Sequence, residues 1–158
     1  MKPIKQTKLH VEGQQKGNCM NAAFASLLEI DIETIPHFED MPNAGEGTKE
    51  KPSWWKAMND WLAELGFYIV AQYQNIYFEG YYIANGPSPR GVEHSVVYKG
   101  SVMVHDPHPS GAGIEKITSA WVLVPIDPAV ITKRFSLRKP NNQQINSDPG
   151  EKMSRLRR

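Results

Sequence analysis

Residues 94–108 read HSVVYKGSVMVHDPH, and this stretch decides the fold of the chain. Two runs rich in β-branched and aromatic residues, Ser95–Tyr98 and Val102–His105, flank the pair Lys99-Gly100. Such residues favour strands, and a short connection that contains glycine favours a tight turn between them. The stretch therefore predicts a β-hairpin with its turn at Lys99-Gly100.

The ends of this hairpin carry an imidazole and a carboxylate. His94 precedes the first strand and Asp106 follows the second. Because the open ends of a tight hairpin lie side by side, we expect these two residues to be cross-strand neighbours. An imidazole oriented by a carboxylate is the usual general base of nucleophilic catalysis, so the pair is a candidate for that role.

Helical patterns precede the hairpin. Small or apolar residues recur at helical spacing from Cys19 to Leu27, and Asn18 stands at the N-cap position. A second helix is predicted from Pro52-Ser53 to about Leu65, with a stripe of tryptophan, methionine and leucine that we assign to the core. Further strands are predicted at residues 67–72, 81–84 and 120–126. Helices first and strands later predict an α+β fold, with the N-terminal helices packed on an antiparallel sheet.

Cys19 is the one cysteine among 158 residues. It cannot form an intramolecular disulfide, and cysteine-rich zinc or iron–sulfur sites are excluded, so a reducing, cytoplasmic location is favoured. A lone thiol is either a small buried apolar group or a reactive one. The start of a helix favours the second, because free N–H groups there lower a thiol pKa and stabilise an oxyanion. Gly17 beside it would let a substrate approach closely.

These features together resemble the papain-like cysteine peptidases. The resemblance rests on GNCMNAA at residues 17–23, HSVV at 94–97 and VHDP at 104–107, in the order Cys, His, Asp. It covers residues 7–126 and is nearest to the bacteriocin-processing (double-glycine leader) peptidases and their uncharacterised phage and bacterial relatives.

The resemblance implies a papain-like fold and a cysteine hydrolase, either peptidase or amidase, that acts on a peptide or protein through a thioester. Cys19 would be the nucleophile, His94 the base and Asp106 its orienting group. The family places a glutamine upstream of the cysteine, which here implies Gln14 or Gln15 as an oxyanion donor. It implies no metal and no organic cofactor.

Further residues are expected to line the substrate cleft. Gly17 and Asn18 flank the thiol, and Ser88 and Arg90 belong to a turn that precedes His94. A serine hydroxyl and a guanidinium suit a substrate carbonyl or carboxylate. The same residues are also compatible with an ordinary turn.

The charge is divided along the chain. Residues 1–132 hold 10 basic and 15 acidic side chains, whereas residues 133–158 hold eight basic and two acidic ones. We interpret residues 1–132 as the peptidase domain and residues 133–158 as a basic tail that solubilises the chain or contacts nucleic acid. No apolar run is long enough to span a membrane. Two other functions stay open, namely a catalytically inactive, phage-encoded binding or inhibitor protein and a nucleic-acid-binding accessory protein.

Overall fold

The computed structural model describes residues 1–43 and 45–129, and Met1–Asp127 form one compact unit. The predicted basic tail lies outside the described residues. In chain order the elements are α1 (Cys19–Leu28), the short helices η1 (Ile32–Thr34) and η2 (Phe38–Asp40), α2 (Trp54–Glu64), β1 (Phe67–Gln72), β2 (Tyr81–Pro87), β3 (Glu93–Lys99), β4 (Val102–His105) and β5 (Ser119–Pro125). No helix of this described part is long and apolar enough to cross a membrane.

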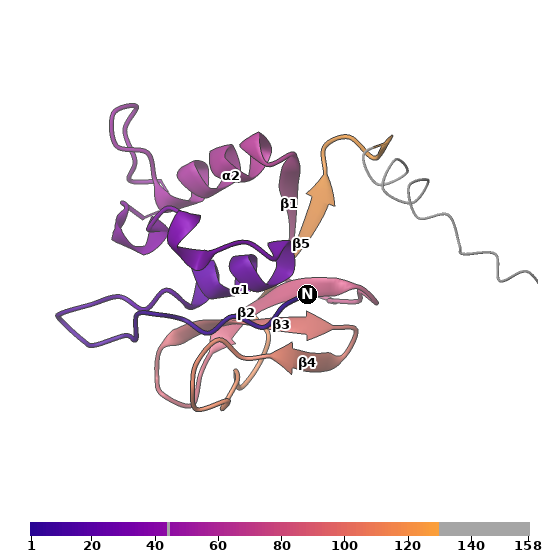
Figure 1. Cartoon of the computed structure of the whole chain (residues 1–158). Coiled ribbons are helices and arrows are strands. Elements are labelled where there is room, and N and C mark those ends of the chain that lie inside the picture. Colours follow the sequence, from indigo (N-terminus) through magenta and orange to yellow (C-terminus); the bar gives the residue numbers. More distant parts are fainter. Residues whose placement is uncertain (44, 130–158) are drawn as a thin grey trace, which may run out of the picture. The chain divides into compact units, whose positions relative to one another are not determined.

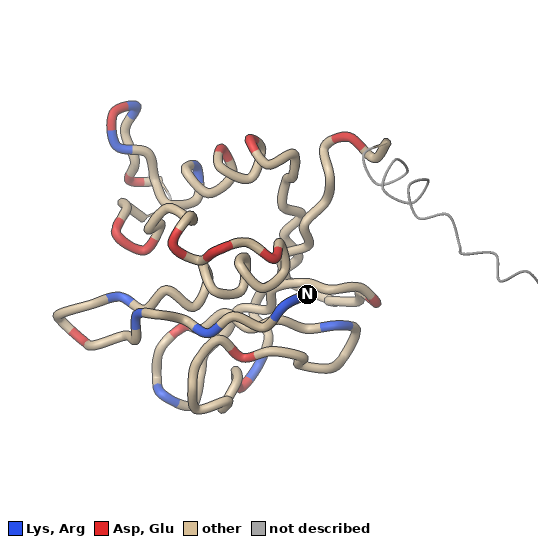
Figure 2. Tube along the Cα trace, viewed as in Figure 1, with Lys and Arg blue, Asp and Glu red and all other residues tan. Residues whose placement is uncertain are grey.

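The five strands form one antiparallel sheet with the order β1-β5-β2-β3-β4. The last strand, β5, therefore lies between β1 and β2, and β4 is an edge strand beside β3 (Figure 1). The predicted α+β class with an antiparallel sheet is confirmed. Acidic residues gather on the segment between α1 and α2, whereas the N-terminal segment is basic (Figure 2).

Both faces of the sheet are covered by apolar side chains. Ile83 and Val97 face the helices and pack into a cluster with Phe24 of α1 and Leu62 of α2. Their neighbours along the strands, including Val96, belong to a second cluster on the other face. Alternation along each strand sends successive side chains to opposite faces, and both sets are buried here. Apolar packing on both faces thus stabilises the sheet.

The predicted second helix is confirmed, and its apolar stripe packs in the core except for Leu65, which is exposed. Met58 and Leu62 are fully buried, and Trp61 meets the rings of Phe24 and Phe38 edge-on or tilted. The helix begins after Ser53, whose hydroxyl accepts a hydrogen bond from the backbone N–H of Lys56. Full burial of a side chain such as Met58 or Leu62 stabilises the fold by about 1.5–3 kcal/mol.

The predicted hairpin forms, but its turn differs from the predicted one. Lys99 pairs with Val102, so Gly100 and Ser101 form the connection and Lys99 still belongs to β3. Gly100 has a positive φ of 57°, which glycine adopts without the strain that a side chain would add. Gly100 thus takes the first position of the turn, where the backbone needs this conformation, and the turn lies one residue later than predicted.

The N-terminal segment forms no strand at Thr7–Val11; there the structure has only an isolated bridge between Val11 and Gln15. The segment instead crosses from α1 to the end of β4. The N–H of Gln6 donates to the carbonyl of Pro107 at 3.1 Å, and a ring nitrogen of His105 lies 2.8 Å from the carbonyl oxygen of Ile4. This path runs along α1: the N–H of Ile4 donates to the Ser26 hydroxyl in the second half of the helix, and the N–H groups of Thr7 and Lys8 donate to Asn18 at its start.

Candidate active site

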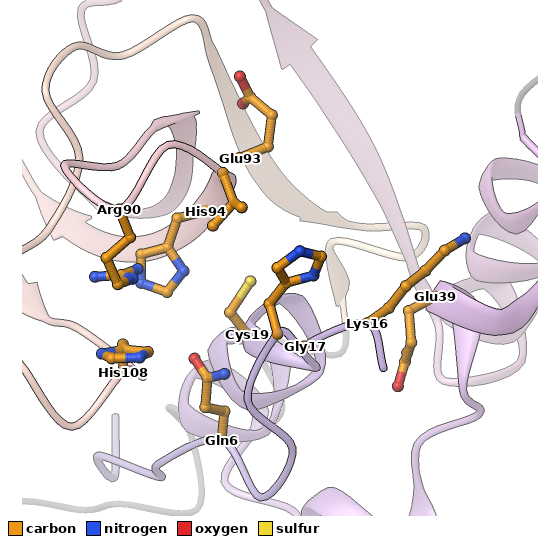
Figure 3. Close-up of a pocket in the computed structure, with 11 residues that line it drawn as sticks. Gln6, Lys16, Gly17, Cys19, Glu39, Arg90, Glu93, His94 and His108 are labelled. Carbon is orange, nitrogen blue, oxygen red and sulfur yellow. The ribbon is translucent and has the colours of Figure 1, made fainter. Parts of the chain in front are cut away.

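One pocket of about 520 Å³ contains the thiol of Cys19 and the imidazole of His94. Figure 3 shows these two side chains facing each other, one from the start of α1 and one from β3. The remaining lining residues come from the N-terminal segment, the α1–α2 connection, the β2–β3 and β4–β5 loops and the start of β3. They are Gln6, His10, Lys16, Gly17, Glu39, Arg90, Val92, Glu93 and His108.

His94 and Asp106 form a buried pair. Nε2 of His94 lies 2.7 Å from Oδ1 of Asp106, and both side chains are almost completely shielded from solvent. The sequence predicted that these residues would meet, and their side chains do. The contact is short enough for a charge-assisted hydrogen bond, which fixes the orientation of the imidazole ring.

Asp106 is held in its ionised form by three hydrogen bonds. Burial raises the pKa of its carboxyl, but hydrogen bonds from His94 and from the backbone N–H groups of Gly113 and His108 outweigh burial, so the pKa lies below its usual range. The two backbone distances are 2.8 and 2.7 Å. An ionised carboxylate only accepts hydrogen bonds, so the shared proton belongs to His94.

With Nε2 donating to Asp106, the neutral form of His94 carries its proton on Nε2 and has a lone pair on Nδ1. Burial lowers the pKa of its ring, although the hydrogen bond to Asp106 opposes that shift. A neutral imidazole with one nitrogen anchored and the other unprotonated is the form that a general base requires. The arrangement suits His94 to take a proton at Nδ1.

The pKa of the Cys19 thiol differs from the one expected from its place at the start of a helix. Burial raises the pKa of its thiol, and hydrogen bonds from Ser95 and from the N–H groups of Met20 and Cys19 offset this only in part. The expectation of a lowered pKa was wrong, because desolvation outweighs the favourable helix end. The side chain is still partly exposed. Among the described hydrogen bonds, none joins its sulfur to His94, whose ring bonds Asp106.

Asn18 holds the N-terminal segment in place of capping α1. It stands at the N-cap position, but its side chain makes no capping hydrogen bond. Its Oδ1 accepts from the N–H groups of Thr7 and Lys8, and its Nδ2 donates to the Thr7 hydroxyl. The side chain is buried, so Asn18 is a structural residue and does not line the pocket. The Asn18 side chain consequently leaves the first N–H groups of α1 uncapped, and those of Cys19 and Met20 point to the Cys19 sulfur.

The two glutamines proposed from the sequence lie elsewhere. Gln14 and Gln15 belong to a turn closed by Val11 and line a different pocket, and the Gln15 amide donates to the carbonyl of Leu9. The turn directs them away from Cys19, so neither is an oxyanion donor here. Gln6 lines the pocket in their place.

Gln6 has the hydrogen-bonding capacity that Gln14 and Gln15 were expected to supply. Its Nε2 donates to the carbonyl of Lys8 at 2.7 Å, which leaves the second N–H of the amide. Its Oε1 is buried without a hydrogen-bond partner among the described residues. A Cβ at Gly17 would lie 3.2 Å from the side-chain amide nitrogen of Gln6 and 3.0 Å from the backbone nitrogen of His10. Glycine at position 17 thus permits the close approach of residues 6–10.

Of the other three residues predicted to line the substrate cleft, two lie in the pocket and one does not. Gly17 and Arg90 line the pocket, whereas Ser88 does not. Ser88 is buried, and both its hydroxyl and its N–H donate to the carbonyl of Val92, so it closes the turn before β3. It thereby fixes the turn that carries Arg90 and that leads directly into β3, where His94 lies.

Besides Lys16, Val92 and Glu93, which adjoin predicted site residues along the chain, sequence reasoning missed Gln6, His10, Glu39 and His108 as lining residues. A signal existed only for His108, since it lies two residues after Asp106 and its N–H bonds that carboxylate. The others are far from Cys19 or His94 along the chain, or on segments without a motif. No group of three or more potential metal-ligating side chains occurs in residues 1–43 and 45–129.

Comparison with protein-family models, with curated proteins and with solved structures finds no match to this chain.

Proposed function

We propose that the chain is a cysteine-dependent hydrolase of papain-like type that transfers an acyl group through a thioester on Cys19. The observation that carries the proposal is the buried 2.7 Å contact of His94 Nε2 with Asp106 Oδ1, because it leaves Nδ1 of His94 as a base in the pocket that holds the thiol. Few structural roles require a buried, neutral imidazole with one ring nitrogen unpaired beside a cysteine.

The mechanism starts from an uncharged thiol and imidazole. His94 takes the proton of Cys19 as the sulfur attacks the carbonyl carbon of an amide or ester. The developing oxyanion is stabilised by the uncapped N–H groups of α1 and by the Gln6 amide. His94 then protonates the leaving group, and water attacks the thioester with His94 again as base. Asp106 keeps the ring in the required tautomer throughout.

The proposal is tested with 4-nitrophenyl acetate, a small activated ester that needs no specific binding site. We expect a burst of 4-nitrophenolate equal to the protein concentration and one acetyl group on intact protein. Because Cys19 is the single cysteine, loss of the adduct in Cys19→Ser assigns the site. His94→Ala should slow acetylation about 100-fold or more.

His37→Ala is the matched control, since His37 is exposed and does not line the pocket. It should acetylate at the native rate. An acetylation rate that is the same in native protein, in His94→Ala and in urea-unfolded chain would contradict the proposal. That result would favour the alternative of an inactive fold that serves as a binding or inhibitor protein.

A further inference from the structure

Arg90 carries a positive charge into the candidate active site without a carboxylate partner. Its Nη1 donates to the Ser110 hydroxyl at 3.2 Å, and no described ion pair joins it to aspartate or glutamate. Glu93 lines the same pocket, but Figure 3 shows its carboxylate pointing away from the guanidinium. A guanidinium is always charged and matches a carboxylate in a two-pronged geometry. Arg90 is therefore available to an anion from outside the chain.

A second cation, Lys5, lies on the same side as Arg90 although residues 1–129 as a whole are acidic. Ser110 bridges Arg90 to His108, whose Nδ1 lies 2.8 Å from the serine hydroxyl. Lys5 lies behind them and donates to the carbonyls of Asp106 and His108. Burial, with the charge of Arg90 in addition, lowers the pKa of His108. The nearby carboxylates are thus otherwise placed: Asp106 bonds His94, and Glu93 forms no ion pair with Arg90 among the described residues.

The position of Arg90 relative to His94 decides which part of a substrate it meets. Arg90, His94 and His108 lie on one side of Cys19 and Glu39 on the other (Figure 3). The rings of His94 and His108 are 6.1 Å apart and nearly perpendicular. In acyl transfer the leaving amine receives its proton from the imidazole, so it must lie on the His94 side. Arg90 therefore faces the leaving group and not the acyl group.

We propose that Arg90 binds a carboxylate on the amine component of the substrate. This inference rests on the proposed function and names its substrate class: amides in which the residue after the scissile bond has a free α-carboxylate or an acidic side chain. The carboxylate pairs with the guanidinium while the amine nitrogen meets His94.

The reverse of amide cleavage gives a direct test, since an amine that attacks the thioester occupies the same place as the leaving amine. In this step the amine nitrogen forms a bond to the acetyl carbon and the C–S bond breaks with its electron pair on sulfur. The amine proton passes to His94 and then to the thiolate. The products are an N-acetylated amine and free Cys19.

The protein is first acetylated on Cys19 with 4-nitrophenyl acetate. Portions of it are then mixed with four acceptor amines, each at the same concentration of unprotonated amine, and the rate of acetyl transfer to each amine is measured. Glycine against glycinamide tests an α-carboxylate, and aspartic acid α-amide against asparagine α-amide tests a side-chain carboxylate. We expect the native chain to favour the carboxylate member of at least one pair about tenfold. The ratio within a pair is insensitive to changes in the acetylation rate.

Arg90→Gln should reduce that ratio to about one, and Arg90→Lys should retain part of it. Lys49→Gln removes the same charge from an exposed loop and should leave the ratio at its native value. A native ratio near one for both pairs, or a preference that persists in Arg90→Gln, would overturn the inference while the proposed function stands. Failure of the native chain to form acetyl-Cys19 would overturn both.

A second measurement needs no acetylation. Iodoacetate and iodoacetamide alkylate the same sulfur but differ in charge, so the ratio of their rates reports the cation beside Cys19. We expect Arg90→Gln to lower the iodoacetate-to-iodoacetamide ratio about tenfold relative to native and to Lys49→Gln. An unchanged ratio would overturn the inference.

Discussion

His94 and Asp106 share one face of the β3–β4 hairpin because β4 holds one residue more than the strand it pairs with. Tyr98 pairs with Met103, but Val97 pairs with His105, so one residue of β4 has no partner. In an unbroken ladder, alternation would place Asp106 on the opposite face from His94. The bulge reverses the alternation at the end of the strand, where it brings the carboxylate to the imidazole.

Removing the Asp106 carboxylate should weaken both the fold and the reaction. In Asp106→Ala the buried N–H groups of Gly113, His108 and His94 lose their acceptor, so we expect the free energy of unfolding to fall by about 2–4 kcal/mol. Acetylation of Cys19 should slow about 100-fold. Urea denaturation and the 4-nitrophenolate burst measure the two effects.

Asp60→Ala is the control for that change, because Asp60 is an exposed aspartate whose partner is Lys56 on the surface of α2. It should change stability by less than about 1 kcal/mol and leave acetylation unaltered. Equal effects of the two substitutions would show that the buried pair has no special role.

Gln6, and not Gln14 or Gln15, should stabilise the oxyanion. Gln6→Ala removes an amide from the pocket, and we expect it to lower the acetylation rate constant about 100-fold with little change in half-saturation by the ester. Gln14→Ala and Gln15→Ala remove the same group from outside the pocket and should match the native chain. The oxyanion role of Gln6 would be refuted if all three variants acetylate at one rate.

Cys19 should titrate as a buried thiol. Because burial raises its pKa above the ordinary 9.0, the midpoint of the thiolate absorbance in the ultraviolet should lie above pH 9.0. The difference spectrum between the native chain and Cys19→Ala isolates this signal from the tyrosines. A thiolate signal that persists below the ordinary histidine pKa of 6.5 would instead reveal a thiolate–imidazolium pair.

The stability of the chain should depend on the protonation of His94. Since burial lowers its pKa in the folded state, the unfolded chain binds the proton more readily, and stability is lost as pH falls through 6.5 toward the folded pKa. Urea denaturation at about pH 7.5 and about pH 5 should show this loss in the native chain and a smaller one in His94→Gln. The contribution of Asp106 is lost only as pH falls below its ordinary 3.8. The same pH dependence in both proteins would contradict a buried neutral His94.

Local patterns in the sequence determined the elements and the main candidates for the reaction. Helical spacing identified α1 and α2, and β-branched runs identified the strands, because both signals come from neighbours along the chain. The proximity of His94 and Asp106 followed from the hairpin that joins them. Cys19 was singled out by its place at a helix start.

Tertiary structure alone decided the other properties of the site. The bulge in β4 sets the face of Asp106, and packing of the N-terminal segment against residues 105–108 brings in Gln6 in place of Gln14 or Gln15. The raised pKa of Cys19 likewise depends on desolvation by segments far away in sequence. Register, long-range packing and solvent exclusion arise only when distant parts of the chain meet, so no local pattern encodes them.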